Sequence, residues 1–109
     1  MVSYCVRYRG SSPDPEAFLG YYREQHAAIL KEWPGIKSLI LHSPVAFEDP
    51  FPVRPAGTML LAQMVFDSAA ALDGALRSEA RRRAREDFAR FPAYSGEVTH
   101  EALRAEVIF

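Results

Sequence analysis

The chain has 109 residues, 49% of them hydrophobic and 25% charged, and its 13 basic and 14 acidic side chains give a formal net charge of −1. A chain of this length supports one core, so we expect a single domain over residues 1–109. The balanced charge disfavours a nucleic-acid binder. No stretch reaches the ~18 apolar residues of a membrane span. The single cysteine, Cys5, excludes an internal disulfide, and because the first residues carry no signal-peptide pattern, a cytoplasmic location is expected.

The first half of the chain predicts a strand, a helix and a second strand. Residues 2–9 alternate between an apolar and aromatic face at the even positions and a mixed face at the odd ones, which is typical of a half-buried strand. Asp14 followed by Pro15 indicates a helix N-cap and first turn. This helix should run to about Glu32, and the apolar residues 36–43 predict the second strand.

A proline-rich stretch follows at residues 44–57. It holds four of the chain's 8 prolines, interleaved with valines and phenylalanines. Prolines at this density exclude an interior strand or helix. A loop of this length in a small domain is usually functional or packed on a partner, so we expect it to be a lid over a pocket, a clasp on a second subunit, or both.

The second half of the chain predicts a strand, a helical region and a last strand. Residues 58–66 alternate as a strand, and Asp67 or Ser68 is expected to cap a helix that reaches Leu76. A further helical stretch covers residues 79–90, and residues 97–109 are expected to contain a short fourth strand and an extended tail.

The order of these elements predicts an α+β fold of the ferredoxin-like type. A β-α-β-β-α-β chain places both helical regions on one face of a four-stranded sheet. The other face is then bare, and with Met59, Leu61 and Val65 on it, that face would be an apolar patch. A homodimer that packs sheet on sheet would cover it, so we expect a homodimer.

Four short motifs resemble the EthD family, a group of the dimeric α/β-barrel proteins. They are Phe18-x-x-x-Tyr22-x-x-x-His26, Pro34-Gly35-Ile36, Phe66-Asp67-Ser68 and Asp87-Phe88. Their order and spacing match over nearly the whole chain. The resemblance implies a dimeric α/β barrel with a pocket between the helices and the sheet of each subunit. It also implies relatives that include methylmuconolactone isomerases and small polyketide-modifying cyclases, decarboxylases and monooxygenases.

The resemblance carries one catalytic candidate over to this chain. His26 matches the first-helix histidine that the lactone isomerases are thought to use. Leu39 and Met64 stand where those isomerases have a tyrosine and a cysteine, and the proline-rich loop has no histidine. Lactone isomerisation itself is therefore disfavoured, and a different substrate or no chemistry is expected.

Three functions remain open. The first is an enzyme that isomerises or cyclises a small apolar cyclic or aromatic metabolite, without a cofactor or metal, using His26 as general acid and base. The second is a non-catalytic accessory protein that binds such a ligand, and the third is a haem-dependent monooxygenase. For the first two, the expected substrate-binding residues are Tyr22, Ile29, Trp33, Leu39, Met64 and Phe88.

Several of these residues also have a purely structural interpretation. His26 could be a core histidine with its hydrogen bonds satisfied, and Tyr22 and Trp33 could be simple core aromatics. The arginine run at residues 81–85 is interleaved with acidic residues and is expected to be a solvated helix face. His42 and His100 are expected on strands or turns, and no metal site is predicted, because the three histidines are widely spaced.

Overall fold

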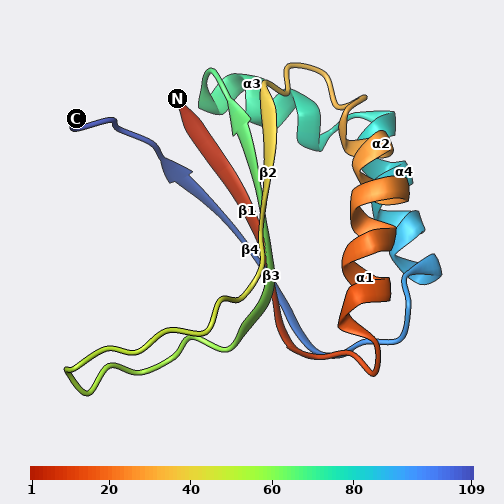
Figure 1. Cartoon of the computed structure of the whole chain (residues 1–109). Coiled ribbons are helices and arrows are strands. Elements are labelled where there is room, and N and C mark those ends of the chain that lie inside the picture. Colours follow the sequence, from red (N-terminus) through yellow and green to blue (C-terminus); the bar gives the residue numbers. More distant parts are fainter.

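The computed structural model describes residues 1–109. Four antiparallel strands form one sheet in the order β2-β3-β1-β4, and the helices lie on one side of it (Figure 1). The strands are β1 (Val2–Ser11), β2 (Ser38–His42), β3 (Thr58–Phe66) and β4 (Ser95–Arg104). The helices are α1 (Pro15–Tyr21), the π-helical turn η1 (Tyr22–His26), α2 (Ala27–Leu30), α3 (Ala69–Leu76), α4 (Glu79–Asp87) and the 3-10 turn η2 (Phe88–Arg90). This is the ferredoxin-like fold expected from the order of elements.

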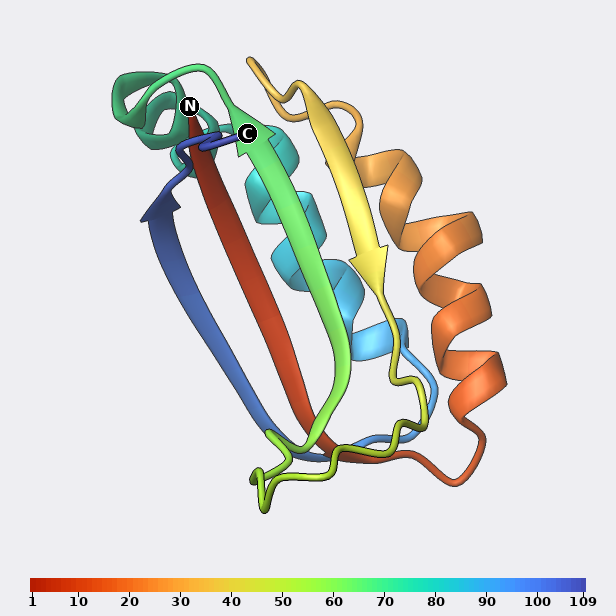
Figure 2. The ribbon, with the colours of Figure 1, turned by 60° about the vertical axis from the view of Figure 1, so that its left-hand side comes forward.

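The two central strands confirm the alternation seen in the sequence. In the ladder between β1 and β3, Tyr4 pairs with Met64 and Tyr8 with Leu60, and all four side chains are buried beneath the helices. The intervening odd positions point to the opposite face. Figure 2 shows the strand order from the side without helices, with the helices behind the sheet.

The first helix runs without a break from Pro15 to Leu30 and contains a wide turn in its middle. Asp14 caps it by accepting a hydrogen bond from the backbone N–H of Ala17 at 3.1 Å. Within η1 the N–H of Ala27 donates to the carbonyl of Tyr22, one residue further back than in an α-helix. Single π-helical turns of this kind are frequent at functional sites, and this one ends at His26.

The fourth strand is longer than expected. It spans ten residues, Ser95–Arg104, because β4 is an edge strand whose mostly exposed side chains carry little alternation that the sequence could reveal. Its start depends on a close backbone approach, in which Gly10 pairs with Gly96. A Cβ built on Gly10 would lie 2.1 Å from the carbonyl oxygen of Ser95, so no other residue fits there.

No helix covers the second face of the sheet (Figure 1). Ile40 and Leu103 are exposed on it, and a polar chain crosses it, with His42 bonded to Gln63 at 3.0 Å and Gln63 donating to Ser3 at 3.2 Å. We call this surface the bare face. No helix has the length and apolar character needed to cross a bilayer.

Two apolar segments project on the same side as the bare face (Figure 1). Residues 43–57 form an extended arm without helix or strand, and its Phe47 and Phe51 side chains are 66% and 73% exposed. The C-terminal tail, residues 105–109, ends in three exposed apolar side chains. The arm therefore lies away from the helices, not over the space between helices and sheet as a lid would.

Candidate functional site

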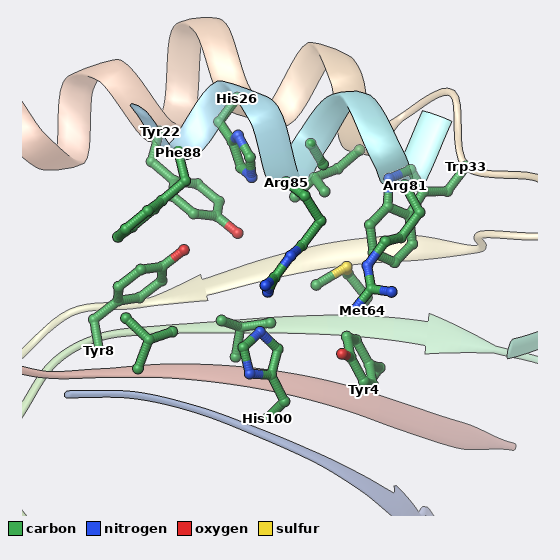
Figure 3. A pocket seen from close by; sticks show the side chains of 14 residues that line it. Tyr4, Tyr8, Tyr22, His26, Trp33, Met64, Arg81, Arg85, Phe88 and His100 are labelled. Atoms are coloured by element: carbon green, nitrogen blue, oxygen red, sulfur yellow. The ribbon is translucent and has the colours of Figure 1, made fainter. Parts of the chain in front are cut away.

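A cavity of about 350 Å³ lies between the helical layer and the sheet (Figure 3). This volume is at the lower end of the ~300–1,000 Å³ range of small-molecule sites. Its walls come from three strands, from the first helix with the turn after it, and from the α4 region. The lining residues are Tyr4, Val6, Tyr8, Tyr22, His26, Leu30, Trp33, Met64, Arg81, Ala84, Arg85, Phe88, Val98 and His100.

His26 borders the cavity and is bonded to a carboxylate behind it. Its Nδ1 lies 2.9 Å from Oδ2 of Asp87, and both side chains are buried, with 6% and 4% of their surface exposed. Asp87 also accepts a hydrogen bond from the Tyr21 hydroxyl at 2.8 Å. An ionised carboxylate only accepts hydrogen bonds, so Nδ1 carries the proton and Nε2 of the neutral ring is left as an acceptor. Nε2 has no partner in the chain.

The environment keeps this pair in the form of a neutral imidazole beside an ionised carboxylate. Burial lowers the pKa of His26 below its ordinary value and outweighs the hydrogen bond and charge of Asp87, which act in the opposite direction. Burial also raises the pKa of Asp87, but the hydrogen bonds from His26 and Tyr21 outweigh it and leave that pKa below its usual range. Near neutral pH, His26 is therefore a base whose conjugate acid would be stabilised by the carboxylate behind it.

Two tyrosine hydroxyls point into the cavity beneath His26. Tyr8 on β1 and Tyr22 on the first helix have ring centroids 6.0 Å apart, and both hydroxyls are directed toward its centre (Figure 3). The Tyr22 ring also contacts the imidazole of His26, with centroids 4.8 Å apart. Burial raises the pKa of Tyr8 and of Tyr22, so both phenols stay protonated and are available as hydrogen-bond donors.

The arginine run on α4 divides between two environments, which corrects the expectation of a uniformly solvated face. Arg82 pairs with Glu79 and Glu86, and Arg83 pairs with Glu32 at 2.7 Å. Arg81, which is half-buried, and Arg85, which is exposed at the rim, instead line the cavity. The acidic residue Asp87, expected on the same solvated face, is buried against His26, because α4 turns that position toward the first helix.

The structure brings most of the sequence-predicted site residues to the cavity. Five line it, namely Tyr22, His26, Trp33, Met64 and Phe88. Ile29 and Leu39 do not. They are half-buried against the core, Leu39 on the edge strand β2, whereas the cavity lies over β1, β3 and β4. The arm at residues 43–57 contributes no lining residue.

Sequence reasoning missed several residues of the site, and for some a signal was present. Asp87 falls on the same helical face as the small apolar residues Ala80 and Ala84, so an acid there stands out on an apolar stripe. His100, expected on a strand or turn without a role in the site, borders the cavity opposite α4. No cluster of three or more His, Cys, Asp or Glu side chains that could hold a metal ion occurs.

Comparison with known proteins places this architecture in context. A family model described as the EthD domain matches residues 11–93. No curated protein sequence matches the chain. Among solved structures, an ethyl tert-butyl ether degradation (EthD) family protein from Bacillus halodurans superposes with a TM-score of 0.76 at 20% identity, covering 97% of this chain and 99% of that one.

Two further structures have the same fold at lower identity. HapK from Hahella chejuensis has a TM-score of 0.66 at 15% identity, over 97% of this chain and 93% of that chain. SnoaB from Streptomyces nogalater, a cofactor-independent oxygenase, has a TM-score of 0.61 at 15% identity, also over 97% of this chain and 93% of that chain. At these identities the likeness shows the fold alone.

Proposed function

The chain belongs to the EthD domain family, and from this premise we propose that it binds a small cyclic or aromatic metabolite between its helices and its sheet and transforms it by proton transfer at His26. The cavity has the size of a small-molecule site and is lined mainly by apolar and aromatic side chains. We also propose that the protein acts in the cytoplasm, since its one cysteine, Cys5, is an unpaired thiol.

The pairing of His26 with Asp87 is the observation that carries this proposal. Nε2 can accept a proton from an acidic C–H or O–H of the ligand, and the carboxylate stabilises the imidazolium that forms. Return of the same proton to another ligand atom completes an isomerisation or a ring closure, with no net gain or loss of atoms. A positioned acid–base group of this kind typically contributes about 10²–10⁴-fold in rate.

The two tyrosines support the same chemistry. Removal of a proton next to a carbonyl places negative charge on the carbonyl oxygen, and protonated phenols can donate hydrogen bonds to it. Tyr8 on the sheet and Tyr22 on the first helix lie at the same end of the cavity, with both hydroxyls directed inward (Figure 3). We therefore assign them the role of holding the developing oxyanion while His26 moves the proton.

Proton abstraction can be tested without knowing the natural substrate. Enolisable bicyclic ketones such as β-tetralone are incubated with the protein in deuterated buffer, and exchange of the acidic C–H is followed by NMR. We expect exchange above the buffer rate, and a loss of about 10²-fold or more in His26→Gln. Arg83→Gln, on the solvent face of α4, is the control and should keep the wild-type rate.

The other outcomes separate the alternatives. Binding without exchange in the wild type, or equal exchange in His26→Gln, contradicts acid–base catalysis and leaves a non-catalytic binding protein. A Soret band in the purified protein would instead favour the haem-dependent monooxygenase.

We further propose a homodimer formed through the bare face. Exposed Ile40 and Leu103, the apolar arm at residues 43–57 and the apolar tail at residues 105–109 all lie on that side of the sheet. The structural neighbours of this chain are dimeric α/β-barrel proteins. A second copy would cover these side chains and give the arm a surface to pack on.

A further inference from the structure

The charge of the cavity lining is positive, although the chain as a whole carries a formal net charge of −1. Arg81 and Arg85 are the only charged residues among those that line it, and no Asp or Glu is present. His26 and His100 are the other ionisable bases, and burial lowers the pKa of each, so both are neutral near pH 7. A ligand in this cavity therefore meets two fixed positive charges.

These two arginines differ from the other arginines of the α4 region in having no carboxylate partner. Arg82 and Arg83 are paired with glutamates, and Arg90 lies 3.7 Å from Asp87. Arg85 makes no hydrogen bond or ion pair, and Arg81 makes only a long contact of 3.4 Å to the carbonyl of Leu76. A guanidinium carries five donors, so other groups of the chain use little of the hydrogen-bonding capacity of this arginine pair.

The pair is positioned along the cavity by the helix that carries it. Phe88 stacks on Tyr8, with ring centroids 6.3 Å apart, which fixes one end of the cavity. Arg81 lies seven residues before Phe88, which is about 10 Å along the helix. Tyr4 lies four residues before Tyr8, which is about 13 Å along β1. Arg81 is therefore at the Tyr4 end of the cavity. Arg85, one helical turn further along, lies above the middle of the cavity, beside His100 (Figure 3).

A second observation at the Tyr4 end is independent of the charges. Trp33 packs against Tyr4, with ring centroids 6.3 Å apart, and borders the cavity. It is buried by the fold, with only 5% of its surface exposed, and its Nε1–H has no acceptor in the chain. A buried donor left unpaired costs free energy, so this end of the cavity holds a polar group that the fold itself does not satisfy.

We infer that the cavity takes a cyclic or aromatic carboxylate, with its anionic group held by Arg81 and Arg85 and its ring at the end formed by Tyr8, Tyr22 and Phe88. The planar guanidinium matches a carboxylate with two parallel hydrogen bonds, and it is less costly to desolvate than an ammonium. In this orientation the ring lies next to His26. The inference rests on the proposed function in that the cavity is the ligand site, and it names the class of that ligand.

A matched pair of small probes tests the inference. Para-tert-butylbenzoate and its neutral amide, para-tert-butylbenzamide, have nearly the same shape and differ in charge. Because Trp33 is the single tryptophan and lines the cavity, its fluorescence reports binding, with calorimetry as an independent readout. We expect the wild type to prefer the carboxylate by about tenfold to hundredfold, and added salt to weaken the binding of the carboxylate only.

Two double variants isolate the arginine pair. Arg81→Gln/Arg85→Gln should lose the preference for the carboxylate and keep its affinity for the amide, which also shows that the cavity is intact. Arg82→Gln/Arg83→Gln removes the same two charges from the solvent side of the same helix and should keep the preference. This control separates local recognition from the effect of net charge.

Each other outcome overturns the inference in an identifiable way. Equal affinity of the wild type for both probes, or equal loss of preference in the two double variants, contradicts recognition of an anion by Arg81 and Arg85 while leaving the cavity as a ligand site. Loss of affinity for both probes alike in Arg81→Gln/Arg85→Gln does the same. Failure of both probes to bind the wild type up to their solubility limits contradicts the ligand site itself, and with it the proposed function.

Discussion

The two faces of the sheet leave different kinds of space to be filled. On the helix-covered face, large side chains such as Phe66 are fully buried, yet the layers leave a cavity of about 350 Å³ lined by aromatic and polar groups. The bare face has no layer above it and presents exposed Ile40 and Leu103 beside a polar chain. A cavity of that size accommodates a small molecule, whereas exposed apolar side chains on an uncovered sheet face are suited to contact with another protein surface. One sheet thus supports a candidate ligand site on one side and a candidate interface on the other.

The largest effect that separates the two faces is expected from neighbouring residues of β3. Phe66 is fully buried beneath the helices, and Val65 is half-buried on the bare face. Phe66→Ala should lower the free energy of unfolding by about 3–5 kcal/mol, and Val65→Ala by about 1 kcal/mol or less. Urea unfolding at low protein concentration measures both. A comparable loss from Val65→Ala would mean that the bare face is already buried in a stable assembly under those conditions.

The next effect concerns the polar group that the covered face buries. Asp87→Ala leaves the Nδ1–H of His26 without its acceptor inside the protein, and we expect a loss of about 1–3 kcal/mol in urea unfolding. Tyr21→Phe removes the second hydrogen bond to the same carboxylate but leaves His26 paired. It should cost less than Asp87→Ala. An equal cost for the two variants would contradict the importance of the bond to His26.

These polar groups also mark the limit of what the sequence could predict. The strand at residues 58–66 was predicted correctly, and Ser68 is the cap of the two candidates, Asp67 and Ser68, because alternation and capping are local properties of the chain. The pairing of His26 with Asp87 joins residues 61 positions apart and depends on how two helices dock, which no local pattern records. For the same reason Arg81 and Arg82 have the same local signal, although one lines the cavity and the other faces solvent.

The π-helical turn and the extent of β4 were beyond local reasoning for other reasons. The residues of η1 continue a regular helical period, so nothing in their order indicates the wider turn. On β4 most side chains are exposed, so its alternation is weak and only the ladder with β1 defines its length. The arm was recognised as a loop from its prolines, but the side of the sheet on which it projects is a tertiary feature.

A smaller effect on the covered face is expected from acid. In the unfolded chain His26 takes up a proton near its ordinary pKa of 6.5, and burial lowers that pKa in the folded protein. Below about pH 6.5 the unfolded state therefore binds more protons, and stability falls as the pH falls, by at most about 1.4 kcal/mol per pH unit for one group. Above that pH the group makes no difference. The lowered pKa of Asp87 acts in the same direction, but only in more acidic solution.

Urea unfolding at about pH 8 and about pH 5.5 measures this dependence. His26→Gln should flatten the loss between the two conditions. His100 also has a lowered pKa, caused by burial and by the charges of Arg85 and Arg81, so His100→Gln is the matched variant that separates the two histidines. If His26→Gln loses as much stability between the two pH values as the wild type does, the sensitivity to acid arises elsewhere in the chain.

The change expected to disturb the covered face least is a charge placed on the bare face. Val65 lies near the end of the central strand β3 and pairs with Ser3 and Ser38 on its two neighbouring strands, so Val65→Asp puts a carboxylate between two strands of that surface. If a second copy packs there, the buried charge should convert the dimer to a monomer in sedimentation velocity. Ala28→Asp, on an exposed position of α2, should leave the dimer intact.

Binding of para-tert-butylbenzoate to Val65→Asp should stay within about twofold of the wild type, because the cavity is on the other side of the sheet. A variant that sediments like the wild type would exclude the bare face as the interface, and a variant that loses the dimer and the ligand together would mean that the two faces are coupled.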